Sequence, residues 1–177
     1  SQKAPFIGLT CAHRGLHSYA DAAEAVAGAG TWVLATKPQV MRSVCESLAG
    51  QARASRPLVM SVAAGITSDQ LDRWLGGDAA VVRTMPNTPA LLGAGVTGLY
   101  ANARVDEAGR ARAQALLESA GTTVWIDDEA RMDAVTAVSG SGPAYVFLLA
   151  EAMEDAAVAQ GLPPADARTL VLQTVLG

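Results

Sequence analysis

Short apolar runs alternate with segments of helical periodicity over the first two-thirds of the chain. The apolar runs that predict strands are 31–36, 57–63, 80–85, 96–100 and 122–126. Helices are predicted over Gln39 to Ala49 with Gly50 just past the end, from Ser68 as N-cap to about Leu75, and over Asp106 to Ser119 with Asp106 as cap. Because each strand is continuously apolar, we expect an α/β fold with a mostly parallel sheet that helices cover on both faces.

The pattern changes after the acidic turn Asp127-Asp128-Glu129, because no strand is predicted from Met132 onward. We expect Ser139 to Pro143 to form a loop that opens a long helix. Ser141 is the expected cap of that helix, and Pro143 lies in its first turn, where a missing N–H costs little.

The long helix is predicted to end at Gly161, and a last helix follows over Pro164 to Leu176. We therefore expect an α/β domain over residues 1–131 and the start of an all-helical domain over 132–177. Two helices cannot enclose a core between them, so their apolar faces must pack on the α/β part, on another chain or on further sequence.

Composition narrows the class of protein. The chain has 177 residues, 50% hydrophobic and 17% charged, which excludes intrinsic disorder. A net charge of −4 gives no bulk attraction to nucleic acid or to an anionic membrane. No apolar stretch approaches the length of about 20 residues that spans a bilayer. The first residues do not resemble a secretory signal. With only two cysteines the chain does not depend on disulfides, so we expect it in the reducing cytoplasm.

Candidate binding residues follow three of the predicted strands, and in a parallel sheet ligands bind beyond the carboxyl ends of the strands. The residues are Ala35, Thr36, Lys37, Pro38, Ala63, Ala64, Gly65, Met85, Asn87 and Thr88. Small residues let a ligand approach the backbone, and Lys37 is suited to a phosphate or a ribose. The alternative for residues 35–38 is a strand end closed by proline, with Lys37 merely solvated. The alternative for residues 63–65 is an ordinary tight turn.

Two prolines fix the backbone around Asn87 and Thr88, so this turn is expected to present one amide and one hydroxyl to a flat polar group. The alternative is a well-capped turn without a ligand, since Asn and Pro are common turn formers.

A fourth candidate segment consists of Ser139, Gly140, Ser141, Gly142 and Pro143. Two glycines beside a helix N-terminus are expected to leave N–H groups bare, and the helix dipole favours an anion there. Alternatively, glycine lets this helix pack tightly on its neighbour.

Several motifs together closely resemble pyrroline-5-carboxylate reductases, in order from about Tyr19 to Gly177. The motifs are Ala-Thr-Lys-Pro-Gln-Val at 35–40, Arg-Thr-Met-Pro-Asn-Thr-Pro at 83–89, Val-Thr-Ala-Val-Ser-Gly-Ser-Gly-Pro-Ala-Tyr at 135–145, Gly-Leu-Pro at 161–163 and Gln-Thr-Val-Leu-Gly at 173–177. A related β-hydroxyacid dehydrogenase is the alternative family, and the Ser-Gly-Ser-Gly-Pro-Ala-Tyr segment argues against it.

The resemblance implies a Rossmann-like fold and the last step of proline synthesis. In that reaction the reduced form of NADP, or alternatively of NAD, donates a hydride to 1-pyrroline-5-carboxylate. It places 35–38, 63–65 and 85–88 on the nicotinamide–ribose side and 139–143 near the substrate. Orientation by the protein is the main requirement, so no catalytic base is named. The resemblance also implies a homodimer or a higher homo-oligomer.

The sequence departs from this family at three places. Phe6-Ile7-Gly8 resembles the end of the family's first strand, but the Gly-x-Gly-x-Met loop, its helix and the next strand do not follow it. Ala22 stands where the family commonly has Asn, and the family's Ser-Pro-Gly-Gly-x-Thr substrate segment is absent. A truncated, catalytically inactive remnant that acts only in assembly is therefore an alternative function.

The remaining candidates for chemistry favour ordinary structural roles. His13 and His17 have an i, i+4 spacing, but no third ligand is evident, so no metal site is predicted. Cys11 and Cys45 have no Cys-x-x-Cys partner and are expected to be plain thiols. The acidic run 127–129 is expected to be a solvated turn.

Overall fold

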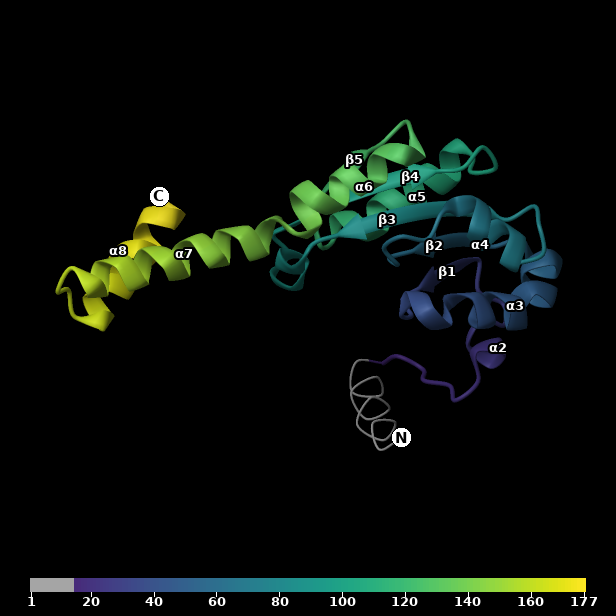
Figure 1. The fold of residues 1–177 in the computed structure, drawn as a ribbon. Coiled ribbons are helices and arrows are strands. Elements are labelled where there is room, and N and C mark those ends of the chain that lie inside the picture. Colours follow the sequence, from purple (N-terminus) through teal and green to yellow (C-terminus); the bar gives the residue numbers. More distant parts are fainter. Residues whose placement is uncertain (1–14) are drawn as a thin grey trace.

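The computed structural model describes residues 15–177 (Figure 1). Its strands are β1 (Thr31–Leu34), β2 (Leu58–Ser61), β3 (Ala80–Pro86), β4 (Gly95–Ala101) and β5 (Gly121–Trp125). The α-helices are α2 (Ala22–Ala25), α3 (Pro38–Ser55), α4 (Ser68–Trp74), α5 (Glu107–Glu118), α6 (Met132–Val135), α7 (Gly142–Ala159) and α8 (Pro164–Leu176). The shorter helical turns are η1 (Thr88–Leu92), η2 (Glu129–Arg131) and the π-helical η3 (Thr136–Gly140).

The five strands form one sheet in the order β1-β2-β3-β4-β5. Strands β1, β2 and β3 run parallel, β4 is antiparallel to β3, and β5 is parallel to β4. The mostly parallel α/β sheet is confirmed. The reversal at β4 follows from the connection over 87–94, which is too short for the crossover that a parallel neighbour requires.

Both faces of the sheet carry a core. On one face, α3 and α4 pack over β1, β2 and β3 with Met41, Leu71 and Leu75 fully buried. On the other face, α5 packs through Ala113 against Met60, Val82 and Leu99. The prediction of full coverage is wrong at the outer strands, because Val33 in β1 and Val124 in β5 are 51% and 47% exposed.

Two predicted helix ends are wrong. Helix α3 continues through Gly50 to Ser55, and it ends at Arg56, whose φ of 45° lies in the left-handed region. A single glycine costs a helix only about 1 kcal/mol, whereas Pro57 disfavours helical geometry at the residue before it. Helix α4 is capped by Thr67 and not by Ser68, whereas the cap of α5 at Asp106 is confirmed by its bond from the Gly109 N–H.

Thr67 forms a capping box with Gln70. The Gln70 N–H donates to Thr67 Oγ1 at 3.2 Å, and the Thr67 N–H donates to Gln70 Oε1 at 2.9 Å. We expect Thr67→Ala to lower the free energy of unfolding by about 1 kcal/mol, measured by urea denaturation. Thr169→Ala is the matched control, since this exposed helical hydroxyl only donates to the Ala165 carbonyl at 2.9 Å, and it should leave stability nearly unchanged. Equal losses in both variants would contradict the capping role.

Residues 139–143 do not form the predicted loop. Ser139 and Gly140 are the last residues of the π-helical turn η3, which follows α6 directly. The Ser141 N–H donates to the Thr136 carbonyl of this turn at 2.8 Å. Ser141 has helical geometry and makes no side-chain cap, while Pro143 lies in the first turn of α7 as predicted. The prediction of a bare N–H is therefore wrong at Ser141, because the preceding helical turn already supplies its acceptor.

Helices α7 and α8 extend away from the sheet and pack against each other (Figure 1). Helix α7 has no buried residue, and α8 buries only Ala167 and Val171. The large apolar side chains exposed on this helical pair are Tyr145, Val146, Phe147, Leu148, Leu149, Val158, Leu162, Leu170, Leu172, Val175 and Leu176. The prediction that these helices enclose no core by themselves is confirmed. None of the helices in the described part has both the length and the apolarity to cross a membrane.

Candidate functional site

The carboxyl ends of β1, β2 and β3 lie at one edge of the sheet. Their register pairs Leu34 with Ser61 and Ser61 with Arg83. The Thr84 hydroxyl donates to the Ser61 carbonyl at 3.0 Å and so joins the last two strands at this edge. Since neighbouring strands are about 4.8 Å apart, the ends of β1 and β3 are separated by about 10 Å.

The end of β1 leads directly into α3. The Thr36 hydroxyl contacts Met41 Sδ at 3.4 Å, and Pro38 is the first residue of the helix. Lys37 is the N-cap residue, and its side chain is exposed and does not cap the helix. The first turn of an 18-residue helix therefore presents its positive end beside Lys37, which suits an anionic or ribose-bearing ligand.

The end of β2 leads into a tight turn. The Ala63 N–H donates to Ser61 Oγ at 3.3 Å, and Ala63 is buried while Ala64 and Gly65 are exposed. Gly65 has a φ of +74°, a conformation that glycine adopts without the penalty of a Cβ atom.

The end of β3 holds Met85, Asn87 and Thr88. The Val96 N–H donates to Asn87 Oδ1 at 2.9 Å, so this oxygen fixes the turn onto the first residues of β4. The capped-turn alternative is therefore supported for the Asn87 oxygen, and a ligand contact by Asn87 stays a prediction. Thr88 is exposed beside it.

Segment 139–143 contacts the end of β3. A Cβ atom added at Gly140 would lie 2.6 Å from Met85 Cε, so the methionine side chain already occupies the space in front of this glycine. In the same way, Val135 packs against Gly98 of β4, where an added Cβ would lie 2.6 Å from Val135 Cγ1. These observations support the packing interpretation of Gly140 and join two of the four predicted segments directly.

The sequence interpretation missed Glu129, which is not part of a solvated turn. Its Oε1 accepts from the Ser68 N–H at 2.6 Å and from Arg83 Nη1 at 2.9 Å, and its Oε2 accepts from the Ser68 hydroxyl at 2.8 Å. The side chains of Arg83 and Glu129 are 8% and 20% exposed. The signal in the sequence is an arginine within an apolar strand, because a buried guanidinium requires an acidic partner.

A hollow of about 290 Å³ lies beside this ion pair. Its lining residues are Gly65, Thr67, Arg83, Glu129, Ala130 and Asp133. Burial raises the pKa of Tyr100 in β4 above its ordinary value. The carboxylates of Glu129, Asp69 and Asp128 raise this pKa further, and Arg110 lowers it. The hollow joins the turn after β2 to the first residues of the helical part.

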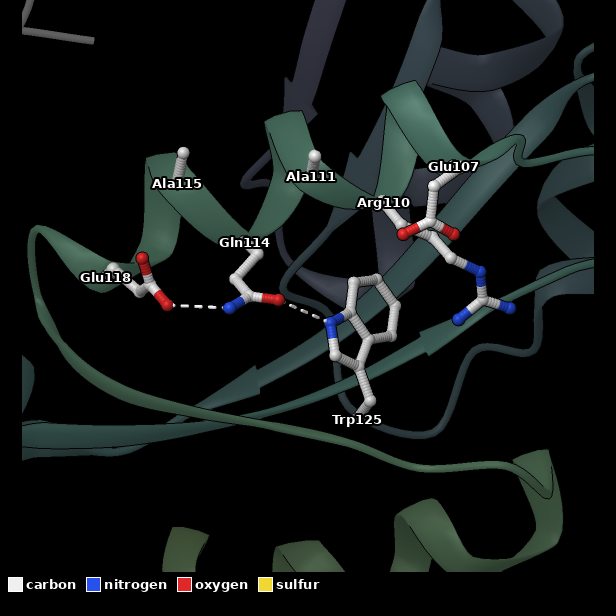
Figure 2. Close-up of a pocket in the computed structure, with 7 residues that line it drawn as sticks. All are labelled: Glu107, Arg110, Ala111, Gln114, Ala115, Glu118 and Trp125. Atoms are coloured by element: carbon white, nitrogen blue, oxygen red, sulfur yellow. Dashed lines mark hydrogen bonds between the residues drawn. The ribbon is translucent and has the colours of Figure 1, made fainter.

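The cavity in Figure 2 lies elsewhere, between α5 and β5. Three of its polar side chains are linked: Trp125 Nε1 donates to Gln114 Oε1 at 2.8 Å, and Gln114 Nε2 donates to Glu118 Oε1 at 2.7 Å. The Arg110 guanidinium lies 4.9 Å from the centre of the Trp125 ring. This cavity contains none of the predicted site residues.

The segment Gly93-Ala94-Gly95-Val96-Thr97-Gly98 has the spacing of a dinucleotide-binding loop but not its structure. It leads into β4 instead of opening a helix, and a Cβ atom at Gly95 would lie 2.7 Å from the Ala90 backbone. Gly95 and Gly98 therefore serve close packing, and Gly93 ends η1 in the left-handed conformation. None of the three opens the helix N-terminus that a pyrophosphate requires.

Of the remaining residues considered for chemistry, His17 and Cys45 lie within the described part of the chain. Within residues 15–177 no group of three potential metal ligands occurs, and His17 is exposed. Cys11 and His13 lie outside the described residues. Cys45 is fully buried, and burial together with Glu46 raises the pKa of its thiol to about 11, which fits a core thiol without redox chemistry.

Comparison with known proteins identifies the family. Residues 129–177 match the family model described as pyrroline-5-carboxylate reductase dimerisation. A pyrroline-5-carboxylate reductase from Pseudomonas aeruginosa is 54% identical over 155 residues, which is 88% of this chain and 56% of that protein. The chain spans about half the length of the curated relatives that it matches.

Solved structures agree with the sequence comparison. A pyrroline-5-carboxylate reductase from Coxiella burnetii superposes on all of this chain and 64% of its own, with a TM-score of 0.90 and 38% identity. A Plasmodium falciparum pyrroline carboxylate reductase with NADP bound covers 82% of this chain and 56% of its own, with a TM-score of 0.75 and 34% identity. The chain therefore belongs to the pyrroline-5-carboxylate reductase family, and it corresponds to a little over half of those relatives.

Proposed function

We propose that this protein reduces 1-pyrroline-5-carboxylate to L-proline with NADPH, NADH being the alternative donor. One observation carries the proposal: Met85 at the end of β3 contacts Gly140, so two motifs that resemble this family lie at one place. A reduced nicotinamide supplies a hydride to the C=N carbon of the imine, and a proton at nitrogen completes the amine.

The residues at the strand ends fit the nicotinamide–ribose half of such a cofactor. The three ends span about 10 Å, and the exposed Ala35, Ala64 and Gly65 leave the backbone open to close approach. Lys37 beside the positive end of α3 suits a ribose or a phosphate. We assign cofactor contact to residues 35–38, 63–65, 85, 87 and 88.

We assign segment 139–143 to the substrate side. Its residues are half-buried, and the Ser139 hydroxyl donates to the Val135 carbonyl at 2.9 Å, so its lone pairs remain available as acceptors. The catalytic contribution of these residues is orientation of the imine against the nicotinamide and exclusion of water, and no side chain is assigned as a base.

We further propose that residues 132–177 are the start of a helical domain through which two copies associate. The exposed apolar faces of α7 and α8, and the dimerisation model that matches 129–177, support this assignment. A homodimer or higher homo-oligomer in the cytoplasm is the expected form, without a nucleic-acid or membrane partner.

A turnover assay tests the proposed reaction. The protein is mixed with NADPH and 1-pyrroline-5-carboxylate, and the absorbance of the reduced nicotinamide is followed together with the formation of proline. We expect proline in equal amount to the NADPH consumed. Binding of NADPH without proline formation would favour an inactive assembly module, and the absence of both would refute the proposed function.

Gly140→Ala tests the contact that carries the proposal. The new Cβ atom must displace Met85, so we expect turnover to fall about 10-fold or more through misplacement of the reacting groups. The loss of stability should be small because the end of the methionine side chain is flexible. Gly50→Ala is the control, since that position in α3 is exposed with open space around it, and it should leave turnover unchanged. Unchanged turnover in Gly140→Ala would contradict the placement of this segment in the site.

A further inference from the structure

The carboxylate of Glu129 ties the beginning of the helical part to the sheet. It accepts three hydrogen bonds, at 2.6, 2.8 and 2.9 Å, from two residues that lie 61 and 46 positions earlier in the chain. Ser68 is 1% exposed, and the Arg83 side chain is 8% exposed. A carboxylate held in this way has its charge and its hydrogen-bonding capacity satisfied in one orientation, so its position is fixed.

The two donors belong to the same strand ends as the proposed site. Ser68 is the first residue of α4, directly after the turn that follows β2, and Arg83 lies in β3 two positions before Met85. Glu129 is thus fixed to the edge of the sheet at which residues 63–65 and 85–88 lie. By contrast, the neighbouring Asp127 makes only a surface pair with Arg131 and is 82% exposed.

The chain from Glu129 to Gly140 is helical without a break, through η2, α6 and η3. Met132 is 2% exposed and Val135 fills the space in front of Gly98, so one face of this segment is packed on the sheet. A displacement at Glu129 is therefore transmitted to Gly140 and to its contact with Met85, since closely packed helical segments move as units.

We propose that Glu129 is a positioning residue that, through Arg83 and Ser68, fixes segment 132–141 against the end of β3. The inference rests on the proposed function, because it assigns this segment to the substrate side of the site. Glu129 does not touch the reacting groups, and its effect is on the geometry of the residues that do.

The test compares Glu129→Gln with Asp127→Asn in the full chain. Both changes remove one carboxylate charge two residues apart, but only the first removes the partner of a buried guanidinium. We expect Glu129→Gln to speed amide hydrogen exchange over 132–141 while exchange in β1 and β2 stays unchanged. The rate constant kcat, counted per NADPH-binding site, should fall about 10- to 100-fold with a much smaller change in KM. Asp127→Asn should change neither measurement.

Ser68→Ala is a second, milder variant in case Glu129→Gln does not fold. It removes the hydroxyl donor and leaves the ion pair and the Ser68 N–H bond in place, so we expect the same direction of change in exchange and in kcat at smaller size. Counting kcat per NADPH site separates loss of positioning from loss of folded protein.

The outcomes distinguish the inference from the proposed function. Unchanged exchange over 132–141, or faster exchange with unchanged kcat, would overturn the positioning role. If the unmodified protein does not reduce the imine, the proposed function fails, and the exchange measurement alone then decides whether Glu129 fixes the segment.

Discussion

Gly121→Ala is expected to destabilise the protein by roughly 3 kcal/mol or more. Gly121 opens β5 with a φ of +140°, a conformation that disfavours any residue with a Cβ atom. An added Cβ would also collide with the backbone carbonyl of Gly95, the register partner of Gly121 in β4. Because this neighbour is backbone, it cannot rotate away as a flexible side chain would. The strand start must shift, and the pairing of β4 with β5 is lost at this end.

Urea denaturation followed by circular dichroism measures this effect. Gly50→Ala is the matched control, because Gly50 lies inside α3 with nothing within 4 Å of an added Cβ. Alanine is favoured over glycine in a helix by about 0.5–1 kcal/mol, so this control should be slightly more stable than the unmodified protein. Losses of similar size in both variants would contradict the explanation from backbone geometry at Gly121.

Arg83→Met is expected to cost about 3–5 kcal/mol of unfolding free energy. Methionine fills a similar volume, so the loss arises mainly from the Glu129 carboxylate, which remains buried without its cationic partner at 2.9 Å. Glu129 retains only the two bonds from Ser68. The free energy of unfolding should therefore fall much more than for the removal of an exposed arginine.

Arg42→Met supplies that comparison. Arg42 pairs with Glu46 at 2.7 Å on the surface of α3, where the two side chains are 70% and 51% exposed, and such pairs contribute at most about 0.5 kcal/mol. Adding Glu129→Met to Arg83→Met should recover part of the loss, because the double variant no longer buries a lone charge. A single-variant loss no larger than that of Arg42→Met would show that the buried pair does not hold the sheet to the helical part.

Local patterns were sufficient to predict the five strands and the helices α3, α4, α5, α7 and α8. The apolar runs at 31–36, 80–85 and 122–126 each overlap a strand of the sheet. The spacing of apolar residues with the cap at Asp106 was sufficient to locate α5. These features depend on neighbours a few residues away, which is the range over which burial periodicity and capping act. The helix ends at Gly50 and Ser68 were predicted wrongly, because α3 tolerates the glycine and continues to Ser55, and because Thr67 takes the cap position of α4.

The candidate site was predicted only in part. The motifs placed residues 35–38, 63–65 and 85–88 at strand ends, and the parallel register of β1 to β3 brings these ends to one edge. The π-helical turn η3 and the bond from the Val96 N–H to Asn87 Oδ1 were not predicted, because each depends on a partner outside the local motif.

The amino-acid sequence alone was enough to predict the alternation of strands and helices, the all-helical segment from Met132 onward and the family to which the chain belongs. The reversed direction of β4, the contact of Gly140 with Met85 and the place of the Glu129 carboxylate between Ser68 and Arg83 became apparent only in the folded protein. Periodicity and turn chemistry act between close neighbours, whereas the Glu129 carboxylate meets partners 46 and 61 residues away only when the sheet has formed.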